Sequence, residues 1–122
     1  MTRNHRSAKK AGTSFERSIA DCLATHVDER IDRRVRTGKD RGDIAGIRLH
    51  GQRVVVECKN TTRLALGEWM RETEDERGND DALLGLIVHK RHGKGDPLDQ
   101  WCTFTVRELV ALLRGQRIEE TP

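Results

Sequence analysis

The chain has 122 residues, of which 34% are hydrophobic and 35% are charged, and its formal net charge is +3. This length supports one domain with a modest core and excludes a multidomain architecture. No apolar run approaches the ~20 residues of a membrane span, and residues 1–11 lack the apolar stretch of a signal peptide, so a cytoplasmic protein that does not enter a membrane is expected.

Charge is unevenly distributed along the chain. Residues 1–41 contain eleven Lys/Arg and six Asp/Glu, whereas residues 68–81 contain two Lys/Arg and seven Asp/Glu. A basic half on a weakly basic protein favours binding of a polyanion, since contacts with phosphates release counterions. The three cysteines, Cys22, Cys58 and Cys102, have no C-x-x-C spacing and are expected to be buried thiols in a reducing compartment.

The first expected elements are a basic arm and a helix. Residues 1–11 lack apolar periodicity and are interpreted as a flexible arm, either ordered on nucleic acid or without a role. A helix is predicted over residues 13–27, where Thr13 and Glu16 have the spacing of a capping box. Its expected buried stripe is Phe15, Ile19, Cys22 and Leu23.

The remaining elements follow in the order β-β-β-α-β-β-α. Strands are expected near residues 31–37, 43–49 and 53–59, followed by a helix over 66–77 with Leu66, Trp69 and Met70 facing inward. A buried strand over 83–90, a loop over 91–99 and a strand over 101–104 come next. Thr105 and Glu108 are expected to cap a last helix, with Leu109, Val110, Leu112 and Leu113 inward, before a tail of residues 116–122. The full order, α-β-β-β-α-β-β-α, predicts a mixed α/β domain with a central mixed sheet flanked by helices.

Residues 53–59 carry the most informative pattern. Because side chains alternate along a strand, Arg53, Val55, Glu57 and Lys59 share one face, and Val54, Val56 and Cys58 share the other. The second set is core. The first set ends in a carboxylate and an ammonium group that point to the same side of the sheet.

Asp43 opens the preceding strand, so the turn between the two strands decides which face its carboxylate joins. A two-residue turn at His50 and Gly51 would pair Asp43 with Cys58 on the core face. A three-residue loop would pair it with Lys59, on the face of Glu57. A three-residue loop or a bulge is therefore expected, with Gly51 in the left-handed conformation.

The pattern Asp-x(n)-Glu-x-Lys, formed by Asp43, Glu57 and Lys59, resembles that of the PD-(D/E)XK nuclease superfamily, with Gly42 in place of the proline. Residues 12–17 and 34–38, together with the Asp-Ile and Glu-Cys-Lys steps, are similar in order to the archaeal-type Holliday junction resolvases. The resemblance covers residues 12–115 and is strongest over 12–62. It implies a restriction-endonuclease-like core and a nuclease domain over 12–115.

The resemblance also implies roles for single residues. Asp43, Glu57 and the carbonyl of Cys58 would hold Mg²⁺, for which Mn²⁺ substitutes, and Lys59 would orient or deprotonate the attacking water. Glu16 would lie near the metal, although a capping role explains it as well. For Asp43, Glu57 and Lys59 the alternative is a surface ion-pair cluster, and Asp40 is an alternative to Asp43 as ligand. His89 and His92 lack the Cys or His partners of a zinc site.

A basic surface next to the acids is expected to bind DNA. Residues 37–41 form a short glycine loop that would present hydroxyl and basic groups to phosphates, or would simply be a polar turn. The candidate DNA contacts are Lys9, Lys10, Arg33, Arg34, Arg36, Thr37, Lys39, Arg41 and Arg63.

The expected function is that of a Mg²⁺-dependent endonuclease that resolves four-way DNA junctions by paired nicks. The symmetry of a junction implies a homodimer. Either the apolar face around Leu66, Trp69 and Met70 or part of the last helix would supply its interface. The alternatives are a branched-DNA or flap nuclease of the same superfamily and a non-catalytic DNA-binding module.

Overall fold

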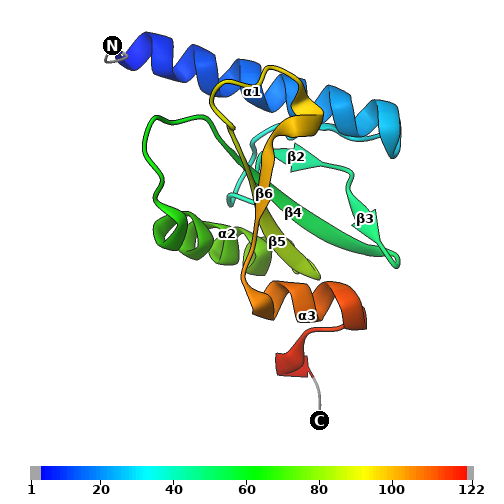
Figure 1. The fold of residues 1–122 in the computed structure, drawn as a ribbon. Coiled ribbons are helices and arrows are strands. Elements are labelled where there is room, and N and C mark those ends of the chain that lie inside the picture. Colours follow the sequence, from blue (N-terminus) through cyan, green and yellow to red (C-terminus); the bar gives the residue numbers. More distant parts are fainter. Residues whose placement is uncertain (1–3, 121–122) are drawn as a thin grey trace.

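The structure is a computed structural model and describes residues 4–120 (Figure 1). Its elements are α1 (His5–His26), β1 (Asp32–Arg33), β2 (Ile44–Ala45), β3 (Arg48–Leu49), β4 (Gln52–Lys59), α2 (Leu66–Asp80), β5 (Leu84–His89), β6 (Trp101–Thr103) and α3 (Val106–Arg114), with 3₁₀ turns η1 (Pro97–Asp99) and η2 (Ile118–Glu120). In the part of the chain that the structure describes, no helix is both long and apolar enough to cross a membrane.

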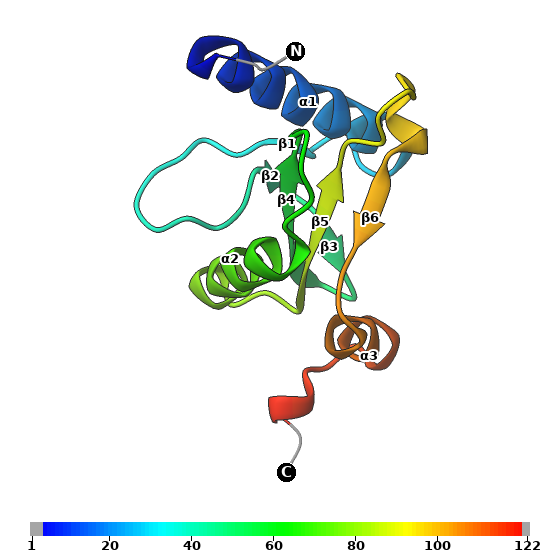
Figure 2. The ribbon, with the colours of Figure 1, turned by 60° about the vertical axis from the view of Figure 1, so that its left-hand side comes forward.

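The six strands form one mixed sheet, which confirms the expected fold class. The strand order is β1-β2-β4-β5-β6, and β3 also pairs with β4. Only β4 and β5 run parallel; the other pairs are antiparallel. Helix α1 passes the carboxyl ends of β4 and β5, and α3 lies at their opposite ends (Figure 2). The carboxyl end of a parallel pair is the usual place for a ligand site in α/β proteins.

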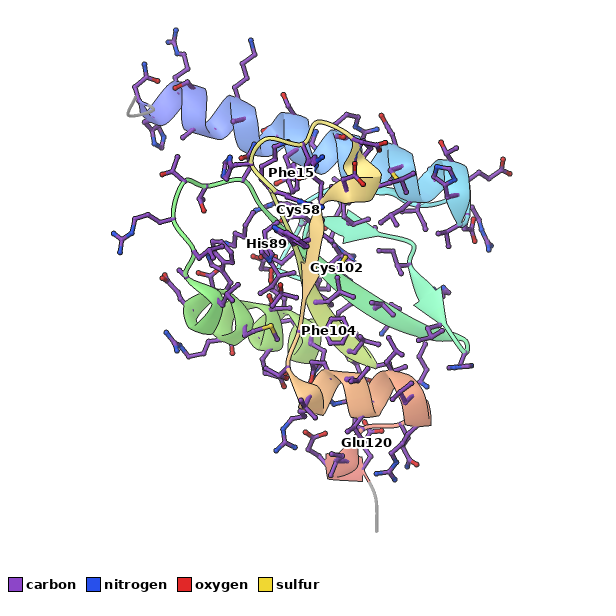
Figure 3. All side chains as sticks on the ribbon, in the orientation of Figure 1. Phe15, Cys58, His89, Cys102, Phe104 and Glu120 are labelled. Carbon is purple, nitrogen blue, oxygen red and sulfur yellow. The ribbon has the colours of Figure 1, made fainter. Side chains whose placement is uncertain are left out.

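Both faces of β4 are buried, on different partners. Val54, Val56 and Cys58 belong to the main core, together with Phe15 and Ile19 of α1. Phe15 lies on the side of α1 that faces the sheet, above Cys58 (Figure 3). The other face, with Val55, Glu57 and Lys59, is covered by α2. The predicted separation of the two sets of side chains is therefore confirmed, and the face that bears Glu57 lies under a helix.

The strand expected over residues 43–49 is interrupted by a bulge. His50 and Gly51 form a two-residue turn, with φ of 53° and 75°, and Leu49 pairs with Gln52. The expected three-residue loop is thus wrong, while the left-handed Gly51 is confirmed. Between the pairs Arg48–Arg53 and Ile44–Val56, the first strand has one more residue than β4. The extra residue is accommodated at Gly46, with φ of 90°, so the expected bulge is present.

Helix α1 begins much earlier than the sequence predicts. Its N-cap is Asn4, whose Oδ1 accepts the amide of Ser7 at 2.8 Å. Thr13 lies within the helix, where its hydroxyl donates to the carbonyl of Lys9 at 3.0 Å. The capping box of Thr13 and Glu16 is therefore wrong, and residues 5–11 form helix instead of a flexible arm. Residues 1–3 of that arm lie outside the described residues.

The end of the chain also differs from the prediction. Thr105 occupies the N-cap position of α3 without a capping hydrogen bond from its side chain. Glu108 is buried, accepts the amide of Gly85 at 3.0 Å and pairs with Arg117 at 2.8 Å. The expected capping box fails because Glu108 turns inward. The segment after α3 is anchored by Arg117, which is only 3% exposed, and is not a free tail up to residue 120.

Other residues expected to be buried are exposed. Leu109 and Leu113 of α3 are 38% and 72% exposed, and Cys102 on the edge strand β6 is also exposed. In α2, Trp69 is buried as predicted, but Leu66 is exposed. The residues that continue the buried stripe of α2 are Thr73, Glu76 and Asp80. The helix thus turns two carboxylates toward the sheet.

Replacing Gly46 by alanine is expected to destabilise the protein by about 2 kcal/mol or more, since an alanine at positive φ is strained and its Cβ would lie 2.8 Å from the carbonyl oxygen of Arg30. Gly78→Ala in α2 is the control, because its Cβ would meet no atom within 4 Å, and it should stabilise by about 0.5–1 kcal/mol. Urea unfolding of both variants measures the two effects. A neutral Gly46→Ala would contradict the bulge.

Candidate metal centre

The carboxylate of Asp43 lies against the carboxyl end of β4. The Asp43 amide donates to the carbonyl of Val56 at 2.9 Å, and its Oδ2 accepts the amide of Cys58 at 2.8 Å. Asp43 also lies within hydrogen-bonding reach of the Glu57 carboxyl. Both residues are buried, at 4% and 7% exposure. The two predicted acids are therefore brought together.

The glycine that precedes Asp43 is required by this close approach. Gly42 has φ of 94°, and a Cβ there would lie 2.9 Å from Cγ1 of Val55 and 3.1 Å from the carbonyl oxygen of Val56. A proline, which fixes φ near −65°, does not fit this conformation. The absence of proline before the acid is thus explained by the path of the chain over β4.

Two further carboxylates join Glu57. Oxygen atoms of Asp40, Glu57 and Glu76 all lie within 4.8 Å of one another, and these three residues are named the acidic triad here. Asp40 is in the loop before β2, Glu57 is on β4 and Glu76 is on α2. Among residues 4–120, this is the group of acidic, His or Cys side chains whose spacing suits a metal ion.

Glu76 is the residue that the sequence interpretation missed. It is 3% exposed, and among the described residues no hydrogen-bond donor reaches either of its oxygens. Its neighbours are the carboxyl groups of Asp40, Asp43 and Glu57. Its spacing from Trp69 and Thr73, at seven and three residues, is that of one helix face, which was the available signal.

Burial and mutual repulsion raise the pKa of the clustered acids. The pKa of Glu57 rises to about 12, first through burial and then through the carboxyls of Asp43 and Glu76. Burial, together with Asp40 and Asp43, raises the pKa of Glu76 to about 7. The pKa of Glu16 is raised by burial and by Asp43. Without a cation, the centre therefore retains protons that a bound cation would replace.

An arginine contacts the acids from the loop before β2. Arg36 pairs with Asp43 Oδ1 and lies 3.6 Å from Glu16, while Arg33 donates to Glu16 at 3.2 Å. Glu16 is thus connected to Asp43 through Arg36, with which both residues pair, and it does not cap a helix. Both oxygens of Asp43 have a donor, one from Arg36 and one from Cys58.

Lys59 lies on the Glu57 face of β4, as predicted. Its Nζ donates to Glu72 of α2 at 2.8 Å. Burial by itself lowers the pKa of Lys59, but the hydrogen bond to Glu72 and the charge of Glu57 raise it above the ordinary value. An ammonium group held in this way stays charged, so it can orient water or phosphate but is poorly suited to act as a base.

The predicted DNA contacts divide into two groups. Arg34 and Arg41 point to the buried carboxylate of Asp80, at 3.7 and 3.8 Å, and therefore also support the loop. Arg33 belongs with these two, because it is half-buried and donates to Glu16. The exposed residues are Lys9, Lys10, Arg36, Thr37, Lys39 and Arg63. A pocket of about 430 Å³ beside Glu16 is lined by Lys9, Gly12, Thr13, Arg33 and Arg36. This pocket provides a place for a phosphate next to the acids.

The donor set fits a hard divalent cation. It consists of carboxylate oxygens, and Glu76 has buried oxygens that no donor group reaches, which is costly unless a proton or a cation compensates its charge. Comparison of the chain with protein-family models, with curated proteins and with solved structures found no match. The nuclease family therefore stays a prediction from the motif.

The raised pKa of Glu76 predicts a pH dependence of the metal-free protein. The pKa of Glu76 in the folded protein, about 7, exceeds its ordinary value of 4.5, so the folded protein binds this proton more tightly than the unfolded chain does. The contribution of this proton to the free energy of unfolding is complete below pH 4.5 and is lost as the pH rises through 7. In EDTA, the wild type should lose on the order of 2 kcal/mol more stability between pH 4.5 and 8 than Glu76→Gln. Urea unfolding at several pH values tests this, with Asp75→Asn as the control. Equal pH profiles for wild type and Glu76→Gln would contradict it.

Proposed function

We propose that this protein is a Mg²⁺-dependent endodeoxyribonuclease that acts on four-way DNA junctions. One observation supports the proposal: the carboxylates of Asp43 and Glu57 lie together at the carboxyl end of β4, and the ammonium group of Lys59 lies on the Glu57 face, near enough for the charge of Glu57 to raise its pKa. Asp43, Glu57 and Lys59 are the three residues that form the Asp-x(n)-Glu-x-Lys motif. Junction specificity is proposed from the resemblance to the resolvases.

Asp43, Glu57 and the carbonyl of Cys58 would hold the ion. The N–H and C=O of one strand residue point to the same strand edge, so the Cys58 carbonyl faces the edge at which its amide meets Asp43. When bound, the ion supplies charge neutralisation at the phosphate and lowers the pKa of a coordinated water. Because the pKa values of Glu57 and Glu16 are raised, these carboxyl groups would release protons when a cation binds.

The other residues of the chain position the substrate. The Lys59 ammonium group, held on the Glu57 face by Glu72, would donate to a phosphate oxygen or to the attacking water. Arg36 would exchange its contact with Asp43 for a DNA phosphate when a cation takes over that carboxylate. Lys9 and Arg33 would bind a neighbouring phosphate in the pocket beside Glu16.

The proposed assembly is a homodimer, because paired nicks in a two-fold substrate require two sites. Trp69 is buried against its own sheet, which leaves α3 as the better candidate interface. Val106, Leu109 and Leu113 on α3 are exposed apolar residues. The proposed place of action is the cytosol, where the three free cysteines would remain reduced.

Cleavage of three DNA substrates of equal length tests the function. With Mg²⁺, an immobile four-way junction should be nicked symmetrically and at least about tenfold faster than a flap or a linear duplex. Similar rates on all three would replace the resolvase by a general nuclease, and a flap preference would favour the branched-DNA alternative. Absence of cleavage in both Mg²⁺ and Mn²⁺ would favour the non-catalytic binding module.

Glu57→Gln should reduce cleavage by about 10³-fold or more while junction affinity stays within about threefold, because a metal ligand is lost and the phosphate contacts remain. The fold should be retained, since glutamine resembles the protonated carboxyl that the raised pKa implies. Cleavage rates and gel-shift affinities measure the two effects, with the exposed Glu68→Gln as the control. Parallel loss of affinity and cleavage would count against the assignment.

A further inference from the structure

The loop of residues 34–43 connects β1 to β2 and bows out between α1 and α2 (Figure 2). It carries one exposed acid, Asp40, and four basic residues that are exposed or half-buried, Arg34, Arg36, Lys39 and Arg41. The backbone of Asp40 is held by α2, because Nδ2 of Asn79 donates to its carbonyl at 2.8 Å. Its Oδ1 accepts the amide of Gly42 at 3.0 Å. The Asp40 side chain is thus directed by the loop itself toward Glu57 and Glu76.

The acidic triad has two features that a solvated acidic cluster lacks. Its ligand oxygens converge within 4.8 Å from three separate elements. Glu76 is almost fully buried among them, and among the described residues no donor reaches its oxygens. An ionised carboxylate that is buried without a donor group is destabilised, because it loses its hydration, and either a proton or a cation can compensate the charge.

The oxygens of Asp43 are in a different situation. Arg36 contacts Oδ1 and the Cys58 amide contacts Oδ2. A cation that enters the centre therefore meets competing donors at Asp43 and none at Glu76. The acidic triad is the better site for the first cation.

We propose that Asp40, Glu57 and Glu76 form a divalent-cation site, separate from the Asp43 ligand set, that fastens the 34–43 loop to α2 and β4. Its all-carboxylate donors select a hard cation such as Mg²⁺ or Mn²⁺. The inference rests on the proposed function only through Glu57, which the two ligand sets share. Binding at this site holds Arg36, Lys39 and Arg41 in place on one side of the centre.

Mn²⁺ binding to the full chain without DNA tests the site, measured from the paramagnetic resonance signal of the free ion. Glu76→Gln and Asp40→Asn should each weaken binding by about tenfold or more, since each removes a ligand. Asp43→Asn removes a neighbouring charge but no ligand of this site, so it should weaken binding by less than either of those two variants. Asp75→Asn, an exposed acid next to Glu76 in α2, should bind as the wild type does.

Limited digestion with trypsin gives a second readout that does not depend on activity. The loop offers cleavage after Arg34, Arg36, Lys39 and Arg41, and Mn²⁺ should slow this cleavage by about fivefold or more in the wild type and in Asp75→Asn. Protection should be lost in Glu76→Gln and in Asp40→Asn. Because Asp40 is exposed in a loop, its variant keeps the test valid if Glu76→Gln folds poorly.

The results separate this site from the nuclease assignment. Wild-type protein that does not bind Mn²⁺, or variants of Asp40 and Glu76 that bind it normally, would overturn the proposed site. Loss of binding in Asp43→Asn alone would do the same, and would leave the Asp43 ligand set as the only one. Cleavage of the junction is scored separately, so a protein that binds Mn²⁺ through the triad and cuts no DNA would refute only the proposed function.

Discussion

The crowding of carboxylates at the carboxyl end of β4 is the constraint on which the rest of this structure depends. Asp43, Glu57 and Glu76 are each less than a tenth exposed, and they lie close enough on a loop, a strand and a helix for burial and the neighbouring Asp43 to raise the pKa values of Glu57 and Glu76. Burying like charges together is unfavourable unless protons or cations compensate them. Protonation, Arg36 and the Cys58 amide provide that compensation when no metal is present. The rest of the fold therefore offsets the unfavourable free energy of these buried carboxylates, an arrangement that suits the binding of a cation.

The local geometry around the acids follows from irregular backbone. The bulge at Gly46 and the positive φ of Gly42 bring the chain back over β4, so that Asp43 reaches the amide of Cys58. A Cβ at Gly46 would collide with the carbonyl oxygen of Arg30, and one at Gly42 would collide with Cγ1 of Val55. Asp80 supports the same loop from α2, because its buried carboxylate attracts Arg34 and Arg41. Loop, strand and helix are thus tied together by charge as well as by apolar contacts.

The sequence was sufficient for the features that repeat along one element. Alternation in β4 predicted that Glu57 and Lys59 share a face, and helical periodicity predicted the burial of Phe15, Ile19 and Trp69. The sequence was insufficient where a side chain pairs with a residue that is distant in the chain. The capping box of Thr105 and Glu108 failed for this reason, because Glu108 pairs with Arg117. That of Thr13 and Glu16 failed because the N-cap of α1 is Asn4 and Thr13 lies inside the helix. Glu76 was missed because the charged residues around it in the sequence obscured its helical spacing from Trp69 and Thr73.

The depth at which α2 sits on the sheet is set at Gly85 of β5, where a Cβ would lie 2.7 Å from Cγ2 of Thr73. Any larger residue at that position would lift the helix, and Glu72 and Glu76 would move with it. Glu72 would then move away from Lys59, and Glu76 would move away from Glu57. The missing side chain at position 85, which pairs with Val55 two residues before Glu57, therefore decides how closely Glu72 and Glu76 approach Lys59 and Glu57.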